Sequence, residues 1–194
     1  MSTKDHQSEP IESASETLQR IFDGHGSVLG SQMADESSRY DVLKKTDFPK
    51  PQRTRRIAVA NQKGGVGKTT STVNTAAALA NKGAQVLVID MDPQGNASTA
   101  LGVSHASGEP SVYDVIEGRS DLGDVITVCP DFPTLDVVPA SIDLSGAELE
   151  VADLPNRNTL LKEALDLYLR QSDKHYDYVF IDCPPSLGLL VINA

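Results

Sequence analysis

Cysteine is scarce in this 194-residue chain, which has only Cys129 and Cys183. The two lie far apart and no CxxC pair occurs, so the sequence contains neither a zinc cluster nor a disulfide framework. Long apolar runs are missing too. No run approaches the roughly 18 residues of a membrane span, and the opening MSTKDHQSEP has no apolar signal-peptide core. We therefore expect a cytosolic protein that is neither exported nor membrane-spanning.

Positive charge is also in short supply. Lys and Arg total 17 against 27 Asp and Glu, which gives a net charge of -10. This balance argues against a surface built mainly to hold nucleic acid or anionic lipid. Hydrophobic residues make up 39% of the chain, below the roughly 45 to 50% that is usual for packed domains. We therefore expect one packed domain and one part of the chain that lies outside it.

The unpacked part is predicted at the N-terminus. Residues 1–52 carry 6 basic and 9 acidic residues with scattered Ser, Gly and Pro, which is typical of a polar, disordered extension. One short helix is expected over residues 11–23, because Ser13 and Glu16 have the spacing of a capping box. A nascent helix in a solvated tail is favoured there over a helix that docks on a partner. Prolines follow at 49 and 51, so the domain is expected to cover residues 53–194.

Within the domain, short apolar runs alternate with helical patterns. Such runs suit strands that are buried on both faces, as in a parallel sheet covered by helices on each side. The expected strands are 57–60, 86–89, 135–138 and 178–181, with a further short one at 125–128. The expected helices are 69–81, 111–117 and 158–170, and 187–192 resembles the start of another. The pattern predicts an α/β fold with a doubly wound, mostly parallel sheet.

A glycine-rich run, KGGVGKTT at residues 63–70, lies directly after a predicted strand and opens a helix. A phosphate-binding loop requires this context. The glycines let the backbone turn so that successive N–H groups point at phosphate oxygens, and the helix adds the positive end of its dipole. We expect Lys68 to reach the β- and γ-phosphates and the Thr69 hydroxyl to bind Mg²⁺. The alternative is a glycine-rich turn with a surface lysine.

The loop departs from the ordinary pattern at its start. That pattern has a glycine five residues before the glycine of the GK pair, but here the position holds Gln62, and Lys63 follows it. Lys68 and Mg²⁺ already neutralise the phosphate charge of one bound nucleotide, so a single site does not need a second lysine. We therefore interpret Lys63 as a group that acts across a dimer interface, in the manner of a finger residue in phosphoryl transfer. The alternative is a solvated lysine at the edge of the loop.

Carboxylates follow two of the predicted strands. Asp90 and Asp92 come after strand 86–89, and because side chains alternate along a strand both point the same way beyond its carboxyl end. Ligands bind at that edge in open α/β sheets. Asp182 ends strand 178–181 and matches the second acidic residue that holds hydrated Mg²⁺. Alone, Asp182 has a turn-forming residue as its alternative, and the loop favours the functional interpretation.

Four segments together resemble the ParA-type deviant-Walker ATPases, which partition chromosomes and plasmids: KGGVGKTT, VLVIDMDPQGNAS, VPASIDLSGAELE and YDYVFIDCPPSLG. The resemblance runs from about Ile57 to the last residue. MinD-type division regulators share the lysine-bearing loop, but DPQGNAS resembles the partition branch. Nitrogenase iron proteins and iron-sulfur carriers of this superfamily use cluster-ligating cysteines, and Cys129 and Cys183 have no such arrangement.

The resemblance implies a role for each matching residue. Lys63 is similar to the signature lysine that reaches the partner subunit's nucleotide in an ATP sandwich dimer. Asp92 matches the carboxylate that positions the attacking water, Asp90 supports the water shell of the metal, and Asp182 matches the Walker B aspartate. The loop residues match as a group: Gly64, Gly65, Val66 and Gly67 as the backbone cradle, Lys68 as the loop lysine, Thr69 as the Mg²⁺ ligand and Thr70 as an α-phosphate contact.

The resemblance further implies an ATP hydrolase of P-loop architecture that uses ATP and Mg²⁺ and switches between an ATP-bound dimer and an ADP-bound monomer. Its implied partners are a second copy, a ParB-type centromere-binding protein and nonspecific DNA, with a location in the cytoplasm at the nucleoid. Family members continue through further strands and DNA-binding basic residues. We therefore expect this chain to be the N-terminal portion of such a protein, truncated at the C-terminus, and to bind DNA weakly by itself.

Other functions remain as alternatives. A fragment that binds nucleotide without hydrolysing it would retain the loop and lose turnover, and a MinD-like positioning regulator would share the loop as well. A small-molecule kinase or synthetase built on the same loop would need an acceptor pocket, for which no segment argues. Hydrolysis of ATP separates the enzyme from the binding fragment.

Overall fold

The computed structural model describes residues 28–46 and 48–194, and the chain divides into two compact units, Met1–Phe48 and Pro49–Ala194. In the first unit the helix α2 spans Val28–Lys45, and the Thr46 hydroxyl donates to the Val42 carbonyl at its end. The sequence predicts no helix there, because the apolar residues of α2 are spread around its axis and form no stripe. The helix predicted at 11–23 lies outside the described residues.

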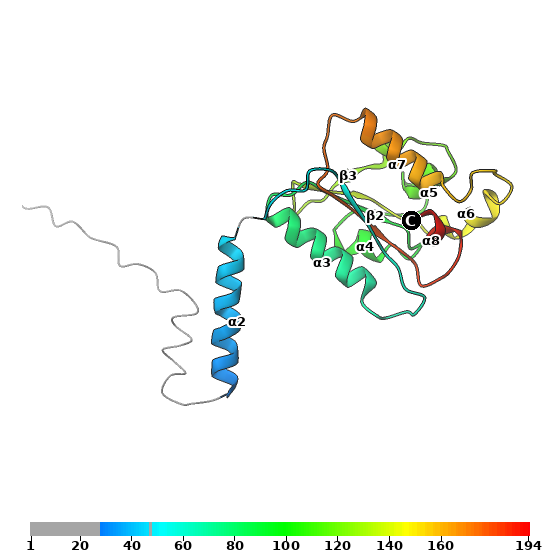
Figure 1. The fold of residues 1–194 in the computed structure, drawn as a ribbon. Coiled ribbons are helices and arrows are strands. Elements are labelled where there is room, and N and C mark those ends of the chain that lie inside the picture. The colour runs from blue at the N-terminus through cyan, green and yellow to red at the C-terminus, as the bar shows by residue number, and fades with distance from the viewer. Residues whose placement is uncertain (1–27, 47) are drawn as a thin grey trace, which may run out of the picture. The chain divides into compact units, whose positions relative to one another are not determined.

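The second unit is built on a five-stranded sheet (Figure 1). Its strands, in spatial order, are β1 (Arg55–Val59), β5 (Tyr178–Asp182), β2 (Val86–Asp90), β4 (Leu135–Val138) and β3 (Thr127–Val128). Neighbouring strands are parallel, except that β3 runs antiparallel to β4. The predicted α/β fold with a mostly parallel sheet is therefore confirmed.

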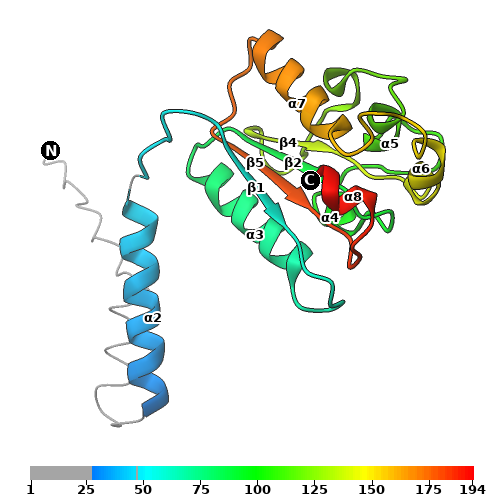
Figure 2. The same cartoon turned by 45° about the vertical axis from the view of Figure 1, so that its right-hand side comes forward.

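Helices cover both faces of this sheet (Figure 2). One face carries α3 (Lys68–Asn81) and α4 (Asn96–Ala100), and the other carries α5 (Val112–Ile116), α6 (Leu144–Glu150) and α7 (Leu160–Gln171). The side chains of β2 show how the strands serve both layers. Val88 joins the core cluster that includes Ala76 of α3, whereas Ile89 joins the cluster that includes Leu161 of α7. Because all of β2 is buried, its sequence is a continuous apolar run ending at Asp90.

Shorter elements differ from the sequence prediction. The strand expected at 125–128 is a 3-10 turn, η1 (Leu122–Val125), followed by the two-residue strand β3. The helices α4 and α6 are not predicted, because five and seven residues are too few to show a helical period. The last helix, α8 (Leu189–Asn193), is fastened to α7 by the buried Asn193, whose side chain accepts from the Leu161 amide at 3.2 Å.

None of the described helices is long and apolar enough to cross a membrane.

Candidate nucleotide site

The glycine-rich loop joins β1 to α3 and has the backbone conformation that its glycines allow. Gly65 and Gly67 have φ angles of 71° and 86°, in the left-handed region that disfavours other residues. Gly67 is the N-cap of α3, and its carbonyl accepts from the Ser71 amide at 2.8 Å. A Cβ atom added at Gly64, Gly65 or Gly67 would meet no protein atom within 4 Å. The loop therefore leaves open space beside its backbone N–H groups, as a phosphate cradle requires.

Two lysines lie at this loop. The Nζ atom of Lys68 is 3.5 Å from the Lys63 carbonyl, so its ammonium group folds back over the loop. Lys63 is exposed, and its backbone N–H donates to the Asn61 side chain at 2.9 Å. Lys63 also lines an open hollow of about 510 Å³ between the start of the loop and the segment around Leu187. The exposed side chain is therefore available to a molecule that approaches this side of the loop.

Asp182 links the loop helix to the middle of the sheet. Its Oδ2 atom accepts from the Thr69 hydroxyl at 2.7 Å, and its Oδ1 atom accepts from the Thr72 hydroxyl at 3.0 Å. Burial raises the pKa of Asp182, while these two hydrogen bonds and the positive charge of Lys68 act in the opposite direction. The structure thus joins Thr69 and Asp182, two of the three residues predicted for the Mg²⁺ site, the third being Asp90.

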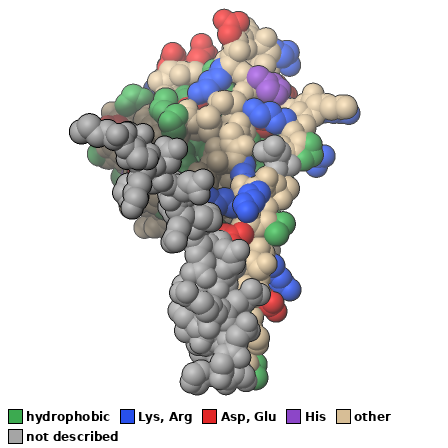
Figure 3. All heavy atoms as spheres, turned by 90° about the vertical axis from the view of Figure 1, so that its left-hand side faces the viewer, with side chains coloured by type: hydrophobic (Ala, Val, Ile, Leu, Met, Phe, Trp, Pro, Cys, Tyr) green, Lys and Arg blue, Asp and Glu red, His purple; other side chains and the backbone are tan. Residues whose placement is uncertain are grey.

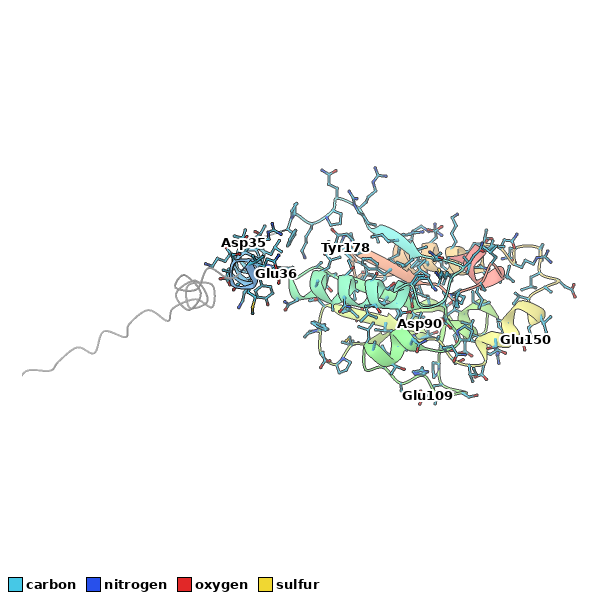
Figure 4. All side chains as sticks on the ribbon, turned by 90° about the horizontal axis from the view of Figure 1, so that it is seen from below. Asp35, Glu36, Asp90, Glu109, Glu150 and Tyr178 are labelled. Atoms are coloured by element: carbon cyan, nitrogen blue, oxygen red, sulfur yellow. The ribbon has the colours of Figure 1, made fainter. Side chains whose placement is uncertain are left out.

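Asp90 and Asp92 follow at the carboxyl end of β2, next to Asp182 in the register of the sheet. Asp90 is fully buried, and Ser98 donates to its Oδ2 atom from the backbone N–H at 2.9 Å and from the hydroxyl at 2.8 Å. Its Oδ1 atom accepts from the Asp92 amide at 3.1 Å. Burial raises the pKa of Asp90 to about 6. In Figure 4 Asp90 is labelled in the middle of the molecule.

Asp92 accepts the hydrogen bonds that close the turn in which it lies. Its Oδ1 atom accepts from the Gln94 amide at 3.0 Å, and its carbonyl accepts from the Gly95 amide at 2.8 Å. Its negative charge contributes to the raised pKa of Asp182. Asp90, Asp92 and Asp182 therefore place three carboxyl groups at the carboxyl edge of the sheet, where a cation would offset their mutual repulsion.

The donor set fits Mg²⁺ bound together with a nucleotide. Among the residues that the structure describes, no three His, Cys, Asp or Glu side chains form a ready metal cage. Mg²⁺ normally keeps several waters and takes one or two protein ligands beside substrate phosphates. Thr69 and Asp182 place a hydroxyl and a carboxylate side by side, which suits this preference for few protein ligands better than a cage of carboxylates would.

The predicted site residues thus come from three places that the fold brings together: the loop after β1, the end of β2 and the end of β5. Three further residues take part for which the sequence predicts no role. Thr72 donates to Asp182, Ser98 to Asp90, and Asn61 supports the loop. Two of these carry a signal in the sequence. Ser98 ends the motif VLVIDMDPQGNAS, and Thr72, three positions after Thr69, lies on the same face of a helix.

Comparisons with known proteins place the chain in a family. Residues 54–194 match the family model AAA_31, described as an AAA domain. The Sporulation initiation inhibitor protein Soj of Bacillus subtilis (strain 168) is 50% identical over 138 residues. The Chromosome partitioning protein ParA of Caulobacter vibrioides (strain NA1000 / CB15N) is 47% identical over the same length. Each alignment covers 71% of this chain, and 53% and 51% of the two relatives respectively.

A solved structure agrees with this placement. Cobyrinic Acid a,c-diamide synthase from Mycobacterium smegmatis, solved with ADP and magnesium and with an ATP analogue and magnesium, is 41% identical with a TM-score of 0.65. The match covers 72% of this chain and 55% of that one. The chain thus spans about half the length of the relatives it matches. It belongs to the AAA_31 family of AAA domains and is of the ParA-type P-loop kind that its four motifs predict.

Proposed function

We propose that this chain carries the nucleotide-binding part of a chromosome- or plasmid-partitioning ATPase that binds and hydrolyses ATP with Mg²⁺. The observation that carries the proposal is the 2.7 Å hydrogen bond from the Thr69 hydroxyl to Asp182, which joins the phosphate loop to the carboxylate of the neighbouring strand. The names of the Soj and ParA relatives support the partitioning role, and the ligands of the related synthase support ATP and Mg²⁺.

The loop residues bind the phosphates in this proposal. The open backbone of Gly64, Gly65, Val66 and Gly67 offers N–H groups to the β-phosphate, and Lys68 neutralises the β- and γ-phosphates. Lys68 needs only to release its 3.5 Å contact with the Lys63 carbonyl to do so. Thr70, the third residue of α3, contacts the α-phosphate.

The carboxylates divide the remaining tasks. Mg²⁺ held by Thr69 and Asp182 supplies charge neutralisation on the β- and γ-phosphate oxygens. Asp92 orients the attacking water, since among the described residues only the Oδ1 atom of its carboxylate accepts a hydrogen bond, from the Gln94 amide. Asp90 supports this arrangement from beneath by fixing the Asp92 amide and the start of α4, and in our proposal it also faces the water shell of the metal.

Lys63 completes the site of a second copy. It is exposed beside an open hollow and its backbone is fixed by Asn61, so its side chain can extend away from the subunit without disturbing the loop. We propose that it reaches the nucleotide of the partner in an ATP-bound dimer and that the dimer separates after hydrolysis to ADP. A ParB-type protein would stimulate hydrolysis, and DNA would bind to the complete protein.

Calorimetry with Mg-ATP tests the loop assignment. Lys68→Ala removes the one side-chain charge directed at the β- and γ-phosphates, so affinity should fall by orders of magnitude. Lys162→Ala is the matched control, because Lys162 lies on α7 with an exposed side chain. Equal affinity for Lys68→Ala and the control would sink the assignment.

Light scattering after size-exclusion chromatography, in ATP and in ADP, tests the dimer. Lys63→Ala should bind nucleotide yet fail to dimerise or hydrolyse it, because the lysine serves the partner's site. Asp92→Ala should bind ATP and remain dimeric, with hydrolysis reduced by orders of magnitude. Normal dimerisation of Lys63→Ala, or parental turnover by Asp92→Ala, would show that the dimer mechanism is wrong.

A second candidate is an ATP-dependent synthase, which the 41% identity to the cobyrinic acid a,c-diamide synthase favours. Such an enzyme would convert a carboxyl group of its substrate into an amide in the presence of ATP and a nitrogen donor. Mass spectrometry of cobyrinic acid incubated with the protein, ATP and ammonia would detect that product. We expect no amide, because the names of the Soj and ParA relatives favour partitioning.

A further inference from the structure

On its inner side, the turn that carries Asp92 is fastened by Asp90 and by the Met91 amide, which donates to the Asp182 carbonyl at 2.9 Å. Asp90 holds the Asp92 amide with one oxygen and the Ser98 amide and hydroxyl with the other. The turn then closes at Gly95, which has a φ angle of 63° and forms the N-cap of α4. A turn held on one side can still move outward, so its outer side decides how firmly Asp92 is placed.

The outer side is covered by His105. A Cβ atom added at Gly95 would lie 2.5 Å from Nδ1 and 2.6 Å from Cε1 of His105, so the imidazole ring rests directly on the Gly95 backbone. The Nε2 atom of the ring shares a hydrogen bond of 2.8 Å with the hydroxyl of Thr99. Gly95 and Thr99 are four residues apart, so the ring bridges the two ends of one helical turn of α4.

The segment that carries His105 is itself held in place. Glu109 accepts from the Ser104 hydroxyl at 2.6 Å and from the Ala106 amide at 3.1 Å, which lowers the pKa of Glu109. Further along, the Ser107 hydroxyl and the Gly108 amide donate to Asp143, the residue that precedes α6. In Figure 4 Glu109 is labelled at the edge of the molecule, away from Asp90.

These hydrogen bonds connect the segment between β4 and α6 to the segment that carries His105. Asp143 belongs to the segment VPASIDLSGAELE, one of the four motifs and the one to which no nucleotide contact has been assigned. The same segment reaches α4 from the inner side, because the Ala140 amide donates to the Ser98 hydroxyl at 3.2 Å. The motif therefore supports the Asp92 turn on both sides. On the inner side it acts through Ser98, and on the outer side it acts through Asp143 and the segment that carries His105.

We propose that His105 is a positioning residue for Asp92. Its ring clamps Gly95 from outside and holds the Asp92 turn against Asp90, so that the carboxylate stays where the attacking water is to be oriented. His105 acts through packing on Gly95 and through the Thr99 hydrogen bond, without contacting nucleotide. The proposal rests on the proposed role of Asp92 in hydrolysis.

The first test measures the clamp without nucleotide. Hydrogen exchange of the Gln94 and Gly95 amides, both bonded to Asp92, reports opening of the turn. In the full chain, His105→Ala should speed their exchange by about tenfold, and His105→Phe, which keeps a ring over Gly95, should restore most of the protection. His175→Ala is the matched control, because His175 is an exposed histidine beside Asp177, at the start of β5. Unchanged exchange in His105→Ala would overturn the clamp.

The second test measures the consequence. His105→Ala should lower kcat for ATP by about tenfold while KM stays near the parental value, because displaced catalytic geometry costs rate and not binding. Thr99→Val should give part of that loss. Faster exchange with a parental kcat would overturn the positioning role. A parental chain that neither binds nor hydrolyses ATP would refute the proposed function instead, and the exchange comparison would still decide whether His105 holds the turn.

Discussion

At the scale of single residues, Asp182 depends on a donor that the motifs do not mark. Thr72 is fully buried, and its hydroxyl donates to Asp182 at 3.0 Å and to the Lys68 carbonyl at 3.1 Å. Thr72→Val removes the hydroxyl while keeping a branched side chain, and leaves one oxygen of a buried carboxylate without its donor. We expect the free energy of unfolding in urea to fall by about 1 to 3 kcal/mol.

Thr75→Val is the control for this change, because Thr75 lies on the same helix with an exposed side chain. It should alter stability by less than about 0.5 kcal/mol. Mg-ATP affinity should also fall in Thr72→Val, since Asp182 loses a bond that helps to keep it ionised. Equal stability of the two variants would contradict the role given to Thr72.

Asp90 makes the stability of the nucleotide-free protein depend on pH. Burial raises its pKa from the ordinary 3.8 to about 6, and the bonds from Ser98 and the Asp92 amide only partly offset that effect. The folded state therefore holds the Asp90 proton more tightly than the unfolded state does. The resulting stabilisation is complete below the unfolded pKa and is lost as the pH rises through about 6.

The measurement compares the parental chain with Asp90→Asn in urea at two pH values. Between pH of about 7 and about 5.5, the parental chain should gain about 1 kcal/mol more stability than the variant does. Other titrating groups are shared by both proteins and cancel in the difference. A parental chain that gains no more than Asp90→Asn on acidification would show that Asp90 does not titrate in this range.

The site residues that the sequence reveals are those whose roles are local. Lys68 and Thr69 stand in one loop, and Asp182 ends a strand whose apolar run is evident, so position along the chain suggests their chemistry. The contact of His105 with Gly95 joins two segments that no motif links, and so does the bond from the Gly108 amide to Asp143. Such contacts depend on how two loops fold against each other, which no spacing rule records.

At the scale of elements, apolar runs predict four strands, of which β1 is exposed along most of its length and the other three are buried. The runs at β2, β4 and β5 are buried nearly throughout, so their composition alone marks them. α2 is missed for the opposite reason, since it has no apolar face to mark it. The apolar run of β4 is interrupted at its second residue by Asp136, a carboxylate that is 1% exposed.

One oxygen of the Asp136 carboxylate is hydrogen-bonded by residues of the connection between α7 and β5. Its Oδ2 atom accepts from Lys174 Nζ and from the Tyr176 hydroxyl, each at 2.5 Å, and burial together with this carboxylate raises the pKa of Tyr176. Its Oδ1 atom has no partner among the described residues. Lys174→Met would leave the buried charge with a single donor. We expect unfolding in urea to be easier by about 2 kcal/mol, less than for a fully buried pair because Lys174 is 39% exposed.

A double variant separates lost pairing from lost packing. Asp136→Leu combined with Lys174→Met removes both charges and fills the site with apolar atoms, so it should recover much of the stability. Lys162→Met is the control, because it breaks an exposed pair with Asp166 and should cost less than about 0.5 kcal/mol. If the double variant proves less stable than Lys174→Met, the unpaired charge is not the cause of the loss.

At the scale of the whole molecule, charge is distributed by function. The carboxyl edge of the sheet carries Asp90, Asp92 and Asp182, and the loop beside it carries Lys63 and Lys68, so charges of both signs meet at the nucleotide site. Elsewhere on the described surface, positive and negative side chains are mixed. Among the described side chains visible in Figure 3, Lys and Arg are interspersed with acidic and uncharged ones. A surface of this kind offers a DNA backbone few adjacent cations.

DNA binding by this chain should therefore be weak and sensitive to salt. Residues 53–194 carry 11 basic against 18 acidic residues, and two of the 11, Lys63 and Lys68, would be occupied by nucleotide phosphates. Fluorescence anisotropy with a labelled duplex should show binding that weakens steeply between about 50 and 200 mM salt. Mg-ATP should weaken it further if the loop lysines contribute, and Lys63→Ala combined with Lys68→Ala should remove that effect of nucleotide. Submicromolar affinity at physiological salt would contradict the prediction and would mean that these 11 cations suffice for a DNA surface.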